Sequence, residues 1–300
     1  MALDVICVGV VTVDTITTVE RVPGADDRVT GEPFAVAGGG PAATAAVALA
    51  RLGVSVGFCG VVGDDDAGAL SRRLLDAEGV DTRWLRTRAD APTPQSMIMV
   101  SRGSGARSIV TTPSRPPDPD SVPIHAARWL HVDQTGYPSV RAALGGRSSP
   151  ALSIDGGNPI PGLDLTAVAL YAPTVTALRA AFPAPDLALS LRAAAAAGAT
   201  HVVATAGGDG CHVLVDGQAV LVPPPAVEPV STMGAGDVFH GALLAGLVQG
   251  RSLVAAVWRA NAVAALSCRA LDGRSGVPDA AETDKYLSTV RPAPWIDGYM

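Results

Sequence analysis

Residues 38–63 read GGGPAATAAVALARLGVSVGFCGVVG, and this stretch decides the fold class. A triple glycine comes first, followed by Pro41 at a first helical position, an alanine-rich helix and a closing glycine. A buried apolar strand then follows, and another apolar segment, residues 5–14, precedes the whole stretch and is predicted to form a first strand that ends at Asp14. Two strands joined by a helix form a β-α-β unit, which implies a parallel sheet.

The alternation of helices and short apolar strands continues along the chain. Helices are predicted at residues 67–80, 186–197, 236–249 and 252–270, and strands at residues 128–134, 151–157, 167–173, 201–208 and 210–217. We therefore predict an α/β fold with a three-layer, doubly wound, mostly parallel sheet in a single domain spanning residues 1–300. Two half-polar hairpin regions, residues 12–37 and 94–112, do not fit a parallel sheet, and we assign them to a small β-sheet lid inserted in that domain.

Composition narrows the class of partner. The chain has 300 residues, 48% of them hydrophobic, and a net charge of −6, so neither nucleic acid nor an anionic membrane is expected to bind it. Its apolar runs are interrupted well short of a membrane span. The four cysteines are far apart and show no metal-ligand spacing, which predicts no protein-bound metal and a cytoplasmic location with reduced thiols. The expected partner is a small molecule.

One compositional feature excludes two chemistries. Lys285 is the only lysine among the 22 basic residues, and it lies far from any glycine-rich turn. A Walker-type phosphate loop requires a Gly-Lys-Ser/Thr sequence, and pyridoxal chemistry requires a lysine in the site. Neither is expected here.

Residues 231–243, STMGAGDVFHGAL, have the pattern of an active site. The turn of Gly234, Ala235 and Gly236 can present consecutive backbone N–H groups at the start of a helix, where the helix dipole adds positive charge. Asp237 follows in the first turn, where we expect the same dipole to favour its ionised form and its action as a proton acceptor. An anion hole beside a base is what phosphoryl transfer to a hydroxyl requires. The alternative is an ordinary acidic residue at a helix start.

Two further glycine-rich turns point to ligand contacts. The segment 202–211, VVATAGGDGC, follows a buried strand at the carboxyl end where open α/β sheets bind ligands, and its alternative is a plain strand-to-hairpin turn. The triple glycine at residues 38–40 forms a platform at another helix start, with close strand–helix packing as the alternative. The segment 130–136, LHVDQTG, offers Asp133 or Gln134 to a substrate.

These motifs together resemble the ribokinase or phosphofructokinase-B type of carbohydrate kinase over nearly the whole chain. The resemblance implies that Asp237 is the catalytic base and that Gly234, Ala235 and Gly236 form the anion hole. It implies an ATP site formed by Thr205, Gly207, Gly208, Gly210 and Asn261. It implies a sugar site that includes Asp14, Gly38, Gly39 and Gly40. ATP, Mg²⁺ carried with the nucleotide and a homodimer formed through the lid are the implied cofactors and assembly.

Three departures from the family pattern affect these expectations. Ala43 stands where the family usually has a sugar-contacting asparagine. Ser231 and Thr232 precede Met233 where the family usually has Asp-Thr, so a monovalent cation is possible but not required. The family's Asn-x-x-Glu, which organises magnesium, is replaced in the segment 172–178, APTVTAL.

Within the family, GGGPAATAA, QSMIMV, GDVFHGAL and GRSGVPD most resemble the sulfofructose kinases. A sulfonate requires a cationic partner, and the candidates are Arg28, Arg102 and Arg107.

Other functions stay open from the sequence. A nucleoside kinase and a catalytically silent sugar or nucleoside binder share the expected fold. A dinucleotide-dependent oxidoreductase is a further alternative, because residues 38–43 imitate a G-x-G-x-x-A fingerprint, although that fingerprint normally opens the first strand–helix turn. His240 lies three residues after Asp237 on the same helix face, and we predict a packed histidine rather than a catalytic one.

Overall fold

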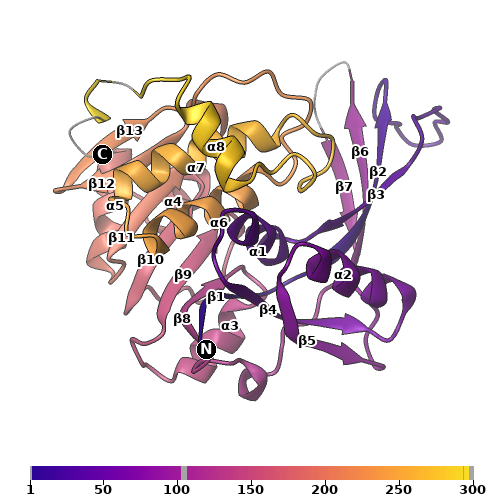
Figure 1. The fold of residues 1–300 in the computed structure, drawn as a ribbon, viewed down its shortest axis with the longest axis horizontal. Coiled ribbons are helices and arrows are strands. Elements are labelled where there is room, and N and C mark those ends of the chain that lie inside the picture. Colours follow the sequence, from indigo (N-terminus) through magenta and orange to yellow (C-terminus); the bar gives the residue numbers. More distant parts are fainter. Residues whose placement is uncertain (1, 103–106, 293, 297–300) are drawn as a thin grey trace.

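The computed structural model describes residues 2–102, 107–292 and 294–296, and it is dominated by one nine-stranded sheet (Figure 1). Its strand order is β13-β12-β11-β10-β9-β8-β1-β4-β5. The strands are β1 (Leu3–Val8), β4 (Val56–Gly63), β5 (Asp81–Arg88), β8 (Ala127–Val132), β9 (Ala151–Gly156), β10 (Val168–Pro173), β11 (His201–Thr205), β12 (Cys211–Val215) and β13 (Gln218–Val222). Only β12 runs antiparallel to its neighbours. The predicted mostly parallel sheet is confirmed.

Helices cover both faces of this sheet, which gives the three layers. One face carries α1 (Pro41–Arg51), α2 (Asp66–Ala77), α6 (Ala235–Val248) and α7 (Leu253–Ser267), with α8 (Ala280–Leu287) against α7. The other face carries α3 (Tyr137–Leu144), α4 (Val175–Ala181) and α5 (Leu187–Ala196). Each face has its own hydrophobic core, and all four cysteines are buried as free thiols. Within the described ranges, no helix is long and apolar enough to cross a membrane.

A second, four-stranded sheet projects from the edge of the molecule (Figure 1). Its order is β3-β2-β6-β7, from β2 (Thr12–Val19), β3 (Ala35–Gly39), β6 (Gln95–Ser101) and β7 (Arg107–Thr111). We call this sheet the lid. It draws its strands from the two segments that did not fit the parallel sheet. Within the predicted hairpin region 94–112, residues 103–106 lie outside the described residues.

The predicted single first strand at residues 5–14 is wrong in one respect. β1 ends at Val8 in the large sheet, and β2 begins at Thr12 in the lid. The chain changes sheets at Gly9, where a Cβ atom would lie 2.3 Å from the carboxyl group of Asp133. Asp14 therefore belongs to a lid strand, where it pairs with Ala37 of β3.

Candidate active site

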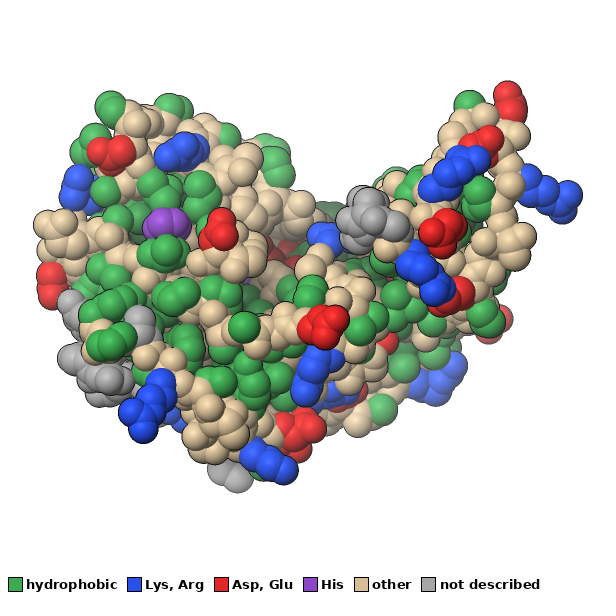
Figure 2. All heavy atoms as spheres, turned by 90° about the horizontal axis from the view of Figure 1, so that it is seen from above, with side chains coloured by type: hydrophobic (Ala, Val, Ile, Leu, Met, Phe, Trp, Pro, Cys, Tyr) green, Lys and Arg blue, Asp and Glu red, His purple; other side chains and the backbone are tan. Residues whose placement is uncertain are grey.

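A cavity of about 510 Å³ lies between the large sheet and the lid. Figure 2 shows the corresponding hollow between the body of the molecule and the projecting arm. The cavity is lined by the carboxyl ends of β9 and β11, the start of α6, the start of α1 and the inner face of the lid. Its size is that of a small-molecule site, and its position is where open α/β sheets bind ligands.

The start of α6 opens into this cavity. Gly234 caps the helix with φ 70°, a left-handed conformation that suits glycine, and a Cβ atom there would lie 2.8 Å from Cα of Gly273. The amide of Ala235 has a long contact of 3.4 Å with the carbonyl oxygen of Thr232. Among the hydrogen bonds of the described residues, none uses the amides of Gly236 and Asp237, as expected for the first turn of a helix. These two donors are available to an anion.

The carboxyl group of Asp237 lines the same cavity. Burial, together with the negative charges of Asp155 and Asp133, raises its pKa to about 7 against the opposing effect of His240 and Arg274. This corrects the expectation that the helix dipole decides the state of Asp237, because loss of solvation dominates over the dipole. The group changes charge near neutral pH, as a general base requires.

Two residues beside Asp237 were not predicted as site residues. Asp155 lies at the carboxyl end of β9, and His240 lies one turn beyond Asp237 on α6; both line the cavity. Nδ1 of His240 is 3.0 Å from Oδ2 of Asp155, and Nε2 is 2.9 Å from the carbonyl oxygen of Ala172. His240 is 4% exposed, so the predicted packing is observed, but its ring also faces an acid. An aspartate at the carboxyl end of a buried parallel strand was the available signal for Asp155.

The residues predicted to bind the sugar substrate come together at the lid side of the cavity. The residues in its wall are Asp14, Gly38, Gly39, Gly40 and Gln134. Thr12 donates its hydroxyl hydrogen to Oδ1 of Asp14 at 2.7 Å, and a Cβ atom at Gly39 would lie 2.0 Å from Oδ2. Gln134 accepts from Nδ2 of Asn158 at 3.3 Å. Asp133, the other candidate from that segment, is completely buried outside the cavity lining.

Arg274 supports this wall from behind and was not predicted. Its guanidinium group is buried, donates to the carbonyl oxygen of Gly39 at 2.6 Å and to the hydroxyl of Thr44 at 3.2 Å, and would be 2.2 Å from a Cβ atom at Gly38. Burial lowers its pKa to about 10, so it stays charged at neutral pH. A side chain at position 38 would therefore have to displace the buried guanidinium group of Arg274.

Of the residues predicted to bind the nucleotide, only one lies in the wall of the cavity. Thr205 lines the cavity, whereas Gly207, Gly208 and Gly210 lie in the turn after β11 and are not among the residues in its wall. Asn261 is buried on α7, where its Nδ2 donates to the carbonyl oxygen of Val222 at 2.9 Å and its Oδ1 accepts from Sγ of Cys211 at 3.1 Å. Its amide group holds the edge strands against α7. A nucleotide contact by these four residues stays a prediction.

The cluster of Asp155, Asp237 and His240 does not fit a resident magnesium ion. Their candidate ligand atoms lie within 4.8 Å of one another. Magnesium takes oxygen ligands in octahedral geometry, whereas this cluster contributes a ring nitrogen that already faces a carboxylate. These three residues are therefore not assigned as magnesium ligands.

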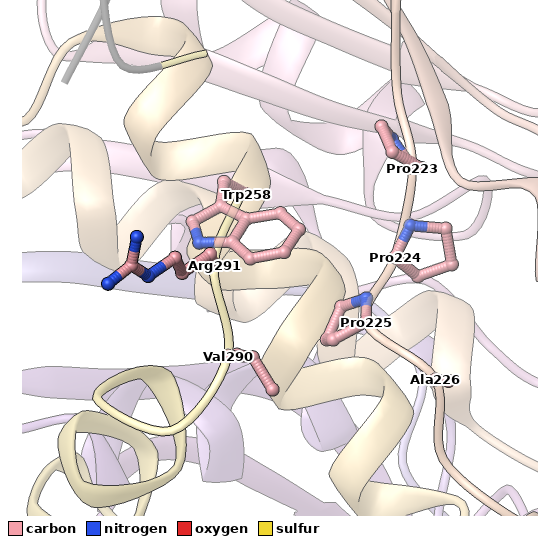
Figure 3. Close-up of a pocket in the computed structure, with 7 residues that line it drawn as sticks. All are labelled: Pro223, Pro224, Pro225, Ala226, Trp258, Val290 and Arg291. Atoms are coloured by element: carbon pink, nitrogen blue, oxygen red, sulfur yellow. The ribbon is translucent and has the colours of Figure 1, made fainter. Parts of the chain in front are cut away.

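A second cavity, of about 310 Å³, lies outside this site. It is bordered by Pro223, Pro224, Pro225, Ala226, Trp258, Val290 and Arg291 (Figure 3). The residues described in its wall include no carboxylate and no histidine, so they offer no proton acceptor at neutral pH. The chemistry therefore belongs to the larger cavity.

Comparison with known proteins places the fold and site in context. The profile described as "pfkB family carbohydrate kinase" matches residues 2–133 and 164–280. A ribokinase of Bacillus subtilis is 29% identical over 300 residues, covering 94% of this chain and 99% of that protein. An ATP-dependent ribose-1-phosphate kinase of Halopiger xanaduensis is 30% identical, covering 93% and 95%. The structure of Arabidopsis thaliana ribokinase complexed with ribose and ATP matches with a TM-score of 0.82 at 23% identity, covering 96% of this chain and 99% of that chain.

Proposed function

This chain belongs to the pfkB family of carbohydrate kinases, and on that premise we propose that it transfers the γ-phosphoryl group of ATP to a hydroxyl group of a sugar or sugar derivative. The observation that carries the proposal is the placement of Asp237, whose carboxyl group faces a cavity beside the unpaired amides at the start of α6. The carboxylate of Asp237 can accept a proton there, and the neighbouring backbone amides can bind a phosphoryl group. Phosphoryl transfer to a hydroxyl requires a proton acceptor and an anion-binding group side by side.

The chain's own residues perform the following steps in this proposal. Asp237 accepts the proton of the sugar hydroxyl while the oxygen of that hydroxyl forms a bond to the γ-phosphorus of ATP. The bond between this phosphorus and the bridging oxygen breaks, and ADP leaves. The turn of Gly234, Ala235 and Gly236 stabilises negative charge on the transferring group through its N–H donors and the positive end of α6. Magnesium enters with ATP and neutralises phosphate charge.

The acceptor and the nucleotide enter from opposite ends of the cavity in this proposal. Asp14, Gly38, Gly39, Gly40 and Gln134 bind the acceptor at the lid end. Thr205, Gly207, Gly208, Gly210 and Asn261 serve the nucleotide at the far end of the large sheet. Support comes from the solved Arabidopsis relative, which holds both ribose and ATP. A monovalent cation stays a possibility from the sequence pattern alone.

An anionic sugar is a specific candidate for the acceptor. Arg107 of lid strand β7 lines the cavity and donates to the hydroxyl oxygen of Thr232 at 2.9 Å, whereas Arg102 is paired with Glu32 outside it. A guanidinium group in the wall can bind a sulfonate or a phosphate. This placement supports the sulfofructose kinase resemblance, and the relative from Halopiger xanaduensis is named for a phosphorylated acceptor. A nucleoside is the alternative acceptor.

The test is a screen for acceptor-dependent ADP release. The panel contains pentoses, hexoses, sulfonated and phosphorylated sugars, and nucleosides, with product mass measured for each positive acceptor. We expect one class to release ADP and gain the mass of one phosphoryl group. Binding of an acceptor without any turnover across the panel would identify a silent binder instead. Positive signals for anionic sugars that vanish in Arg107→Gln, with neutral sugars unaffected, would establish the anionic class.

Assembly through the lid is the second part of the proposal. Val36, Met97 and Val110 lie in one row across the lid sheet, because Val36 and Met97 both pair with Thr15 and Val110 pairs with Met97. They are 59%, 58% and 67% exposed, a large apolar surface for an outer face. We propose that a second copy covers this row. Light scattering should report a dimer that Met97→Lys converts to a monomer, and a monomeric wild-type protein would contradict the proposal.

The dinucleotide-dependent oxidoreductase loses support at the start of α1. The amide of Ala42, which a bound pyrophosphate would use, lies 3.3 Å from Oδ2 of Asp133. A protein carboxylate already occupies the position of the ligand's anion. A cytoplasmic location stays a prediction from the free cysteines.

A further inference from the structure

His240 has oxygen atoms close to both nitrogens of its ring. Nε2 is 2.9 Å from the carbonyl oxygen of Ala172 on β10, which can only accept, so Nε2 carries a hydrogen. Nδ1 is 3.0 Å from Oδ2 of Asp155, close enough for an ion pair but without hydrogen-bond geometry. A bare Nδ1 would set its lone pair against the carboxylate, whereas a hydrogen on Nδ1 makes this contact attractive. The two contacts therefore favour hydrogens on both ring nitrogens, which makes the ring a cation.

The groups around His240 explain why a cation is stable at this buried position. Asp155 at the end of β9 is in contact with it, and Asp237 lies one turn before it on the same helix. His131 of β8 has its ring centroid 6.1 Å away, with Nδ1 3.0 Å from the hydroxyl oxygen of Ser153, and burial lowers its pKa to about 4, so it is neutral.

More distant charges complete this environment. Asp133 at the end of β8 raises the pKa of Asp237, and Arg274 behind the lid-side wall lowers it. A ring nitrogen of His240 and one carboxylate oxygen each of Asp155 and Asp237 lie within 4.8 Å of one another.

We propose that His240 is a positioning residue that acts as a buried permanent cation, fixing the carboxylate of Asp155 and allowing Asp237 to stay ionised beside it. The inference rests on the proposed function for its kinetic consequence, but the charge of the ring is a property of the structure alone. Two carboxylates facing one cavity share a proton unless a positive charge separates their pKa values. A shared proton on Asp237 would block its action as base.

The first experiment tests the charge without using activity. ¹⁵N–¹H NMR of histidine-labelled protein at about pH 7.5 reports which ring nitrogens carry hydrogen, because an ordinary histidine is mostly neutral at that pH. We expect His240 to show two protonated nitrogens and His131 to show one. His131→Gln and His240→Gln assign the two signals. A His240 ring with a bare nitrogen at this pH overturns the proposal, whatever the enzyme phosphorylates.

The second experiment tests the consequence for Asp237. In His240→Gln the ring and its charge are replaced by a neutral amide, and we expect the acid limb of kcat/KM to move up by about one pH unit or more, with the rate recovering at high pH. His131→Gln serves as the matched control, since it removes a neighbouring neutral ring and should leave the limb in place. A uniform fall in rate with an unmoved limb would assign His240 a purely structural role and overturn the proposal.

Charge compensation provides the final control. The double variant His240→Gln and Asp155→Asn removes one positive and one negative charge, so the acid limb should return toward the wild-type position. If the single variant fails to fold, the NMR measurement on the wild-type protein still decides the ring's charge. Failure of the double variant to move the limb back would contradict the electrostatic mechanism.

Discussion

The starts of α1 and α6 are built alike and used differently. Both helices begin at a glycine with positive φ, 91° at Gly40 and 70° at Gly234, and neither has a side-chain cap. At α1 the protein takes the amide of Ala42, because Asp133 accepts from the amides of Val10 and Ala42 with one oxygen and from the amides of Thr135 and Gly136 with the other. At α6 the first donors face the cavity.

The difference shows that one local sequence pattern can serve either a structural contact or a ligand-binding cavity. A glycine-headed helix start attracts an anion in both places. At α1 the carboxyl group of Asp133 fills that role and joins β8 to the first loop and to the helix. At α6 the first donors face the cavity, beside Asp237, the proposed base. The sequence pattern alone does not distinguish the two, because the occupant of α1 lies some ninety residues away.

The largest effect is expected from Asp237→Asn, which removes the base and keeps the shape. We expect kcat to fall by roughly 10²- to 10⁴-fold, the usual contribution of a positioned base, while acceptor and nucleotide still bind. The burial that raises the pKa of Asp237 to about 7 makes its charge unfavourable at higher pH, so the variant should be no less stable than wild type at pH 8. Steady-state kinetics and thermal unfolding check both statements, and undiminished turnover would remove Asp237 from the role of base.

Asp133→Asn should break the other helix start. In asparagine an NH₂ group replaces one of the two carboxylate oxygens. This donor group would face two backbone N–H donors and leave both of them without an acceptor in the protein interior. We expect a loss of about 2–4 kcal/mol in the free energy of unfolding, from two unmet buried donors. Denaturant unfolding measures the loss. The folded Asp133→Asn protein should retain most of its kcat. A variant with wild-type stability but no activity would instead indicate a catalytic role for Asp133.

The pH dependence sharpens the comparison further. Since Asp237 acts only when ionised and its pKa is raised to about 7, kcat/KM should increase with pH through that region and level off above it. Below the midpoint the rate should fall about tenfold per pH unit, as for a single required base. Asp133→Asn should keep the shape of this profile and move its midpoint to lower pH, because the variant lacks a negative charge that raises the pKa of Asp237. A rate that is flat down to pH 5 would show that the carboxylate titrates at an ordinary value.

Much of the scaffold could be predicted from local patterns. The β-α-β unit around Pro41, the helix that contains Asp237 and the hairpin at β6 and β7 follow from periodicity and glycine positions, and the structure contains all three. Short or polar elements escaped, among them α3, α4, α8 and β5. The strand β5, DTRWLRTR, lies at the sheet edge with few buried side chains, so it lacks the apolar signal of a central strand.

The candidate site divides in the same way. The triple glycine and the α6 turn could be named because each combines unusual residues within a few positions, whereas Asp14 was named through the family resemblance. Asp155 and Arg274 escaped because their importance comes from contacts across the fold: Asp155 meets His240, and Arg274 lies behind Gly39. The break of the first strand at Gly9 also depends on a distant residue, Asp133. Long-range contacts of this kind are absent from any local window.

The two walls of the cavity belong to different sheets. Asp14 and Gly39 are part of the lid strands β2 and β3, whereas Asp237 belongs to the body. Any tilt of one sheet relative to the other would therefore change the distance between Asp14 and Asp237. Under the proposed function, a substituent that presses against the lid would then alter the alignment of the acceptor hydroxyl with Asp237.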